Sequence, residues 1–377
     1  MPSLTRRRAA FALLLLVLFA WMFVARASTR MPDFEVYWRA GARAAAAEPL
    51  YRAADTDYQF KYFPAFAVLT IPLGAVPIGT ARAIWFSLSA AAFVALLALS
   101  TELPERRRSR AFLITMLLIG LAKYYAEELI LGQINILVAL VAACAILAFQ
   151  TGRDIAGGLL VALAIVLKPY ALILAPWVVA RRRWHSIAAM SAGLGIAVAL
   201  PAIVYGLDGT IALHRDWWRT VTTTTEGTLL ATKNVSLTAL WARRVGIGPE
   251  AMWLSAASSM ALLIAAAAMF IRRNGVRRPD GLEAGVLLAM TPLISPQGWD
   301  YVLVLATPML VFLVNDVDRL SRPLRLLAYA GIAAVGLTLF DLLGRRVLYA
   351  LLEWSVVTLG MLALIAAAVA VRMRKLA

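Results

Sequence analysis

Isolated charged side chains at the ends of long apolar segments are the features of this sequence that could do chemistry. Asp33 follows Pro32 in the polar segment after the first apolar stretch, and Lys168 stands alone within residues 155–180, which are otherwise largely apolar. An ionisable side chain inside a membrane is a candidate functional group by default, because burying its charge there is costly. The structural alternatives are an N-terminal helix cap for Asp33 and snorkelling to the interface for Lys168.

These residue types suit the transfer of a group from a phosphate to a hydroxyl. One carboxylate can take the proton of an acceptor hydroxyl as general base. Cationic side chains can stabilise the charge that develops on a departing phosphate. A single displacement of this kind inverts the configuration at the reacting carbon and needs no second carboxylate as nucleophile. Lys61, which lies between aromatic residues, and the amides of Gln133 and Asn135 are further candidates for the same face.

Other chemistries have little support in the sequence. The two histidines, His185 and His214, have no partner at metal-ligand spacing, and Cys144 is the single cysteine. We therefore expect no metal site, no cofactor and no intrachain disulfide. The net charge of +16 comes largely from short arginine clusters between apolar segments. That distribution is typical of membrane-protein loops rather than of a nucleic-acid-binding surface.

Long apolar segments predict an all-α integral membrane protein. The chain is 62% hydrophobic with a mean hydropathy of +0.79, and a span needs ~20 apolar residues. We expect an uncleaved first helix, a shallow hairpin at residues 155–180 with Lys168 and Pro169 at its tip, and a re-entrant or interfacial piece at residues 63–77. Counting the hairpin as two, about twelve transmembrane helices form a single polytopic domain over residues 1–377. The other spans are expected at about residues 81–100, 110–125, 132–150, 186–205, 251–271, 283–295, 299–315, 324–343 and 347–371.

The arginine clusters also predict an orientation. Short clusters such as Arg6–Arg8, Arg106–Arg110 and Arg181–Arg183 recur at alternate span ends, which the positive-inside rule assigns to the cytoplasm. Two longer segments, about residues 26–80 and 206–250, then become outer-face loops with surface helices. One such helix is expected from Asp33 to Ala47, lying on the membrane surface.

Several short motifs, taken in order, resemble glycosyltransferase family 87. That is a family of polyprenyl-phosphate-sugar-dependent transferases with the multi-span C-type fold. The matching stretches span about residues 30–310 and are Asp-Phe-Glu-Val-Tyr-Trp at 33–38, Pro-Leu-Tyr at 49–51, Lys-Tyr-Phe-Pro at 61–64 with Pro-Leu at 72–73, Gly-Gln-Ile-Asn at 132–135, Leu-Lys-Pro at 167–169, Asn-Val-Ser-Leu at 234–237 and Ser-Pro-Gln-Gly-Trp-Asp at 295–300. Two positions depart from the family. Val235 stands where glutamine is frequent, and no histidine follows the Ser-Pro-x-x-Trp motif.

The resemblance implies roles for particular residues. Asp33 would be the catalytic base in a C-type glycosyltransferase-like bundle. Contacts to the donor phosphate are expected from Lys61, Lys168, Arg215, Arg219 and Lys233. The substrate pocket is expected to include Glu35, Tyr37, Tyr62, Gln133, Asn135, Asn234, Trp299 and Asp300.

The leading hypothesis is therefore a membrane hexosyltransferase, with mannose as the favoured sugar, although the sequence does not separate mannose from other hexoses. It would move the sugar from a polyprenyl phosphate to a lipid or glycan acceptor at the extracytoplasmic face of the plasma membrane, as a multi-pass protein that binds no nucleic acid. A transporter or flippase of lipid-linked sugars is the alternative. That class predicts repeat-related halves and broken helices near the bilayer midplane, whereas the polar residues here gather at span ends. A non-catalytic assembly protein has no need for Asp33 together with Lys61 and Lys168.

Overall fold

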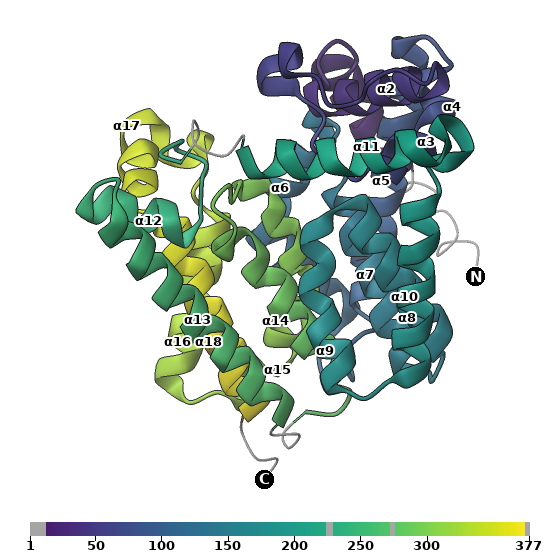
Figure 1. Cartoon of the computed structure of the whole chain (residues 1–377). Helices are drawn as coiled ribbons and strands as arrows, with labels where there is room; N and C mark the ends of the chain where they lie inside the picture. The colour runs from purple at the N-terminus through teal and green to yellow at the C-terminus, as the bar shows by residue number, and fades with distance from the viewer. Residues whose placement is uncertain (1–12, 224–228, 272–275, 374–377) are drawn as a thin grey trace, which may run out of the picture.

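Helices make up nearly all of the regular structure. The computed structural model describes residues 13–223, 229–271 and 276–373, so the expected Arg6–Arg8 cluster lies outside the described residues. Within these ranges no strand forms, and one isolated antiparallel bridge joins Asn234 to Trp299. The expectation of an all-α protein is confirmed (Figure 1).

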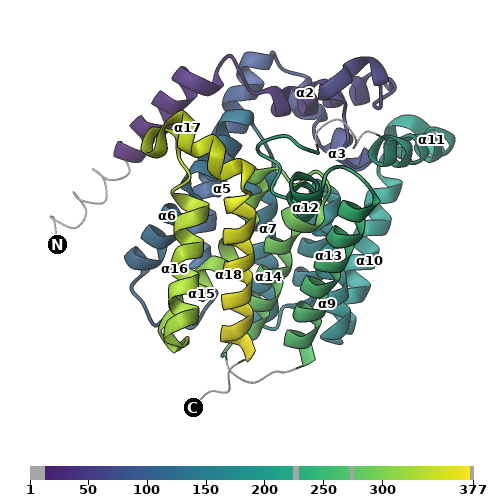
Figure 2. The same ribbon diagram turned by 90° about the vertical axis from the view of Figure 1, so that its left-hand side faces the viewer.

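Most of the helices run between two ends of the molecule (Figures 1 and 2). Within the described ranges four helices can cross a membrane by length and composition, and up to eight spans result if each of four bent pairs counts as one. These findings fit an all-helical membrane protein, whereas the total of about twelve spans stays a prediction. The long helices are the one at Leu13–Ala27, α5 (Ile78–Ser100), α6 (Arg110–Leu131), α7 (Asn135–Gln150), α8 (Asp154–Leu167), α10 (Trp184–Ala199), α13 (Pro249–Ile271), α14 (Pro279–Ile294), α15 (Thr307–Asp316), α16 (Arg322–Gly336) and α18 (Val356–Met373).

Further helices lie across one end of this bundle, which we call the α2 end (Figure 1). They are α2 (Pro32–Ala45), the 3₁₀ helix η2 (Ala53–Tyr58), α3 (Pro64–Leu69), α4 (Ile71–Gly74), α11 (Ala202–Thr223), α12 (Leu237–Val245) and α17 (Phe340–Glu353). The opposite end holds the α5–α6, α7–α8 and α9–α10 connections and the end of α18 (Figure 2). The two ends therefore differ in kind, with helices lying across only the first.

Residues 206–250 contain helices, because α10 bends by 90° into α11, and α12 follows. One expected span is wrong. Residues 347–371 do not form a single helix, because α16 bends by 98° into α17, and α18 begins only after Ser355. In α11 the exposed apolar side chains of Ile203, Leu207 and Ile211 accompany charged ones. A helix with both kinds of side chain is stable along a membrane surface rather than across the hydrocarbon layer.

Helix α2 packs on protein, not only on the membrane surface. Its buried Val36, Ala40 and Ala44 follow the expected helical spacing. The backbones of α2 and α4 approach so closely that a Cβ at Gly41 would lie 2.3 Å from the Thr70 carbonyl oxygen. This glycine contact fixes α2 against α4 and so fixes the position of Asp33 in its first turn.

The predicted hairpin is present. Helix α8 ends at Leu167, Lys168 has extended backbone, and Pro169 begins the 3₁₀ helix η3 (Pro169–Leu174), which continues into α9 (Ala175–Ala180). Pro169 prevents α8 from continuing because it has no N–H and its ring clashes with the preceding turn. The turn therefore places Lys168 at the tip of the hairpin.

The base of this hairpin is fixed by ion pairs at the opposite end. Arg183 binds Asp154 at 2.6 Å and Asp280 at 3.2 Å. Glu283 in α14 accepts from Arg181 at 2.5 Å and pairs with Arg372 at 2.8 Å, and both Glu283 and Arg372 are fully buried. These contacts tie the hairpin to α14 and α18.

Candidate active site

Asp33 lies half-buried in the first turn of α2. Met31 occupies the N-cap position and no side chain caps the helix, so the interpretation of Asp33 as an N-cap is wrong. Burial raises the pKa of Asp33, while the charge of Lys168 and the side chain of Gln133 partly oppose that rise. A carboxylate with a raised pKa is a stronger base once it is ionised.

A hydrogen-bonded group of phenols and one amide lies beside Asp33. The hydroxyls of Tyr37 and Tyr62 are 2.6 Å apart, and Tyr37 donates to Gln133 Oε1 at 3.0 Å. Gln133 Nε2 in turn donates to the Tyr301 hydroxyl at 3.3 Å. Burial raises the pKa of Tyr37 and of Tyr62 well above the usual value, so both stay neutral. The group fixes Gln133, which joins α2 to the start of the 3₁₀ helix η5 at residues Asp300–Ala306.

Lys168 meets this group from the tip of the hairpin. Its Nζ lies 4.4 Å from the ring centroid of Tyr62 and 5.7 Å from that of Tyr170. Asp33 and Glu128 are the charges that act on it. Among the described residues the side chain of Lys168 makes no hydrogen bond or ion pair, so the three N–H donors of its ammonium stay available to a ligand.

Glu128, which the sequence-based site did not include, lies on the other side of Lys168. This fully buried carboxylate accepts from the backbone N–H of Asn135 at 2.9 Å and of Ile136 at 3.3 Å, and from Asn135 Nδ2 at 2.5 Å. Tyr170 donates to Asn135 Oδ1. Glu128 thus binds the N-terminus of α7, whose dipole favours a negative charge. The acidic pair Glu127-Glu128 at the end of an apolar segment was the signal that could have identified it.

A second group of charges gathers between α6 and η5 (Asp300–Ala306). Lys233 forms an ion pair with Glu127, and this contact keeps the pKa of Lys233 above its usual value although burial acts in the other direction. Lys123 donates to the Thr338 carbonyl oxygen at 2.9 Å. Asp300 is buried, and the charges that act on it are Glu127, Lys233 and Lys123.

Asn234 has a scaffolding position. Its Oδ1 accepts from the Gly298 N–H at 3.2 Å, and its Nδ2 donates to the Pro296 carbonyl oxygen at 2.9 Å. The neighbouring Val235 N–H donates to the Gly298 carbonyl oxygen at 2.7 Å. These bonds hold the turn that presents Trp299, whose ring stacks with that of Tyr301 at a centroid distance of 6.3 Å.

The remaining candidates lie toward the rim of the α2 end. Glu35 pairs with Arg82 at 3.4 Å. The backbone oxygen of Lys61 accepts from Trp217 Nε1 at 3.3 Å, which brings α11 to the segment before α3. Arg215 and Arg219 are exposed on α11 and are not part of the group around Asp33. The structure thus brings Asp33, Tyr37, Tyr62, Gln133, Asn135 and Lys168 together.

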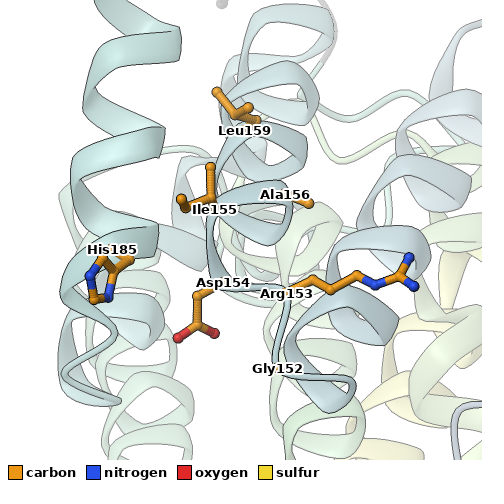
Figure 3. A pocket seen from close by; sticks show the side chains of 7 residues that line it. All are labelled: Gly152, Arg153, Asp154, Ile155, Ala156, Leu159 and His185. Carbon is orange, nitrogen blue, oxygen red and sulfur yellow. The ribbon is translucent and has the colours of Figure 1, made fainter.

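Hollows lie elsewhere in the described part of the chain. One of about 570 Å³ is at the opposite end, lined by Gly152, Arg153, Asp154, Ile155, Ala156, Leu159 and His185; Figure 3 shows Arg153 turned away from Asp154 and His185. Another, of about 690 Å³, is an apolar groove between α12 and α13 that reaches Ile294 and Pro296. In the described residues no three His, Cys, Asp or Glu side chains are placed to hold a metal ion.

Comparison with known proteins gives one finding. The model of glycosyltransferase family 87 matches residues 60–296, which is more than half of the chain and includes Lys61, Gln133, Lys168 and Asn234. No curated protein and no solved structure matches significantly.

Proposed function

The chain belongs to glycosyltransferase family 87 and is a membrane glycosyltransferase, and from that premise we propose that it transfers a hexosyl unit, specifically mannosyl, from a polyprenyl-phosphate sugar to a lipid or glycan acceptor. The observation that carries this proposal is that Asp33 and Lys168 lie beside the same hydrogen-bonded group of phenols and one amide. A base and a cation that makes no ion pair come from elements far apart in the sequence and lie in one half-buried polar group.

In the proposed reaction Asp33 accepts the proton of an acceptor hydroxyl as its oxygen attacks the anomeric carbon. The bond from that carbon to the phosphate oxygen breaks, and the polyprenyl phosphate leaves with the electron pair. Lys168 stabilises the phosphate charge as it develops. The proton on Asp33 then passes to solvent, and the anomeric configuration is inverted because one displacement occurs.

The other proposed contacts follow from position. Lys61, Arg215 and Arg219 lie near the rim and would guide the lipid phosphate, with Lys233 on the side toward α12. Tyr37, Tyr62, Gln133 and Asn135 would form the wall of the pocket, with Glu35, Asn234, Trp299 and Asp300 around it. No metal or cofactor takes part in this proposal.

We place the α2 end at the extracytoplasmic face of the plasma membrane. Arg107, Arg110, Arg183 and Arg277 all pair with acids of connections at the opposite end. Positively charged short loops face the cytoplasm in most membrane proteins. This distribution supports the orientation, and the sugar donor would then reach Asp33 from the outer leaflet.

The test is transfer by the purified full chain in lipid nanodiscs, with radiolabelled polyprenyl-phosphate hexoses and membrane-lipid acceptors. Replacing Asp33→Asn keeps the shape and removes the base, so transfer should fall by roughly 10²–10⁴-fold. Glu48→Gln, which changes an exposed carboxylate paired with Arg52, is the matched control. Full transfer by correctly folded Asp33→Asn protein would exclude the proposed base.

A further inference from the structure

A buried carboxylate at the start of η5 has an oxygen without a hydrogen-bond donor. Asp300 is 8% exposed, and its Oδ1 has no hydrogen-bond partner among the described residues. Native proteins keep few such atoms, because a buried acceptor that loses its water and gains no donor is destabilising. The backbone fixes its place, since the Asp300 N–H donates to the Lys233 carbonyl oxygen at 3.0 Å. This oxygen is therefore held in position to accept a hydrogen bond from a ligand.

The charges around Asp300 favour a neutral ligand. Two lysines, Lys123 and Lys233, and two acids, Asp300 and Glu127, make up the group, so its formal charges cancel. An anion gains little from such a group as a whole. A hydroxyl both donates and accepts, so it can give a hydrogen bond to the carboxylate while it receives one from an ammonium. Lys168, in contrast, lacks an ion pair and suits a phosphate.

The two residues next to Asp300 in the sequence are aromatic. Trp299 and Tyr301 stack with an interplanar angle of 9° and are half-buried. An aromatic face packs against the C–H face of a sugar ring and leaves the hydroxyls at the ring edge free for polar contacts. The Tyr301 hydroxyl also accepts from Gln133, which connects this group with the pocket of Asp33.

We propose that Asp300, Lys123 and Lys233 form, with Trp299, a subsite that recognises vicinal hydroxyls of a neutral hexopyranose ring. One hydroxyl donates to Asp300 Oδ1 and its neighbour accepts from a lysine. The ring enters past Lys233, whose side chain is 54% exposed. The subsite rests on the proposed function, because the ring belongs either to the transferred sugar or to the acceptor.

Binding can be measured without transfer. Saturation-transfer NMR with methyl hexopyranosides and their single-deoxy derivatives, on the purified full chain in detergent, detects weak sugar contacts. We expect a signal that Asp300→Asn weakens on the order of 10- to 100-fold in affinity, the usual effect of losing a hydrogen bond to a charged group. Glu48→Gln, which changes an exposed carboxylate paired with Arg52, should keep it. If no methyl hexopyranoside binds, or Asp300→Asn binds as the wild type does, the subsite does not exist and Oδ1 holds only a water molecule.

Kinetics then separate the two sources of the ring. A rise in KM for the donor after Asp300→Asn assigns the subsite to the transferred sugar, and a rise in KM for the acceptor assigns it to the acceptor. One of the deoxy derivatives should lose the most affinity for the wild type. For Asp300→Asn, the absence of the same hydroxyl should cause little further loss of affinity, because the two changes remove the same contact. Additive losses would overturn the proposal. Sugar binding without transfer from any donor would instead reject the proposed function and leave the subsite standing.

Discussion

Replacing Lys168 by methionine tests the pairing of base and cation most directly. Methionine keeps much of the length of the side chain and removes its charge. A hydrogen bond to a charged partner contributes about 1.5–3 kcal/mol. At 1.4 kcal/mol for each factor of ten, kcat/KM for the lipid-phosphate sugar should fall roughly 10- to 100-fold. Inhibition by free polyprenyl phosphate should weaken by a similar factor.

The same variant should also change the pH dependence. The charge of Lys168 lowers the pKa of Asp33, against the rise caused by burial. Removing that charge leaves burial less opposed, so the pKa of Asp33 rises further. On the acid limb of the kcat/KM profile the base is protonated and inactive. This limb should then move to higher pH. Lys168→Arg keeps a cation and should leave the limb near its original position.

The assay is transfer from radiolabelled donor across a pH series, with the folded state of each variant checked by thermal unfolding. A merely structural role for Lys168 would lower the amount of folded protein and leave the pH profile of the remaining activity unchanged. An acid limb that stays in place, or moves to lower pH, in well-folded Lys168→Met protein would refute the proposed coupling of Lys168 to Asp33.

Three further outcomes are expected. Asp33→Asn should stabilise the protein at pH values above the pKa of Asp33. The pKa of Asp33 is raised in the folded state, so the wild type loses stability as the pH rises through that pKa, and asparagine does not ionise. Thermal unfolding that is the same for both proteins across the pH range would contradict this. Glu283→Gln should destabilise by about 3–5 kcal/mol because buried arginines lose their partner, and a detergent unfolding titration that shows no loss would contradict it. In a Cys144→Ala background, Tyr58→Cys should react with an impermeant maleimide from outside and Trp184→Cys only after permeabilisation, since both positions are well exposed; the reverse pattern would invert the orientation.

The apolar pattern predicts the class of fold better than it predicts where individual helices begin, bend and end. Hydropathy identifies the segments that can enter a membrane, and the Lys168–Pro169 turn follows from proline chemistry. The bends at Gly206 and Ser355, both with positive φ, depend on how amphipathic helices meet the end of the bundle. Segment length alone therefore merged part of α17 with α18 in one expected span.

The residues of the candidate site also differ in how far the sequence alone identifies them. Lys168 is recognisable because its charge stands out from apolar surroundings, whereas Asp33 is identified by the resemblance of residues 33–38 to the family. Glu128 and Tyr170 depend on contacts between α6, α7 and η3 that no local pattern contains. The scaffolding hydrogen bonds of Asn234 likewise come from a chain reversal that joins its segment to residues 296–298.

Lys168 stays available for a ligand because its support lies elsewhere. Glu128 is close enough to act on Lys168, but its oxygens are occupied by the N-terminus of α7. The hairpin is instead held at its base by the pairs of Arg181 and Arg183. At 1.5 Å per residue, the 14 residues of α8 carry the tip about 21 Å away from those ion pairs. Rigid anchoring at the base thus positions a cation at the tip without neutralising it, which is what a lipid-borne phosphate requires.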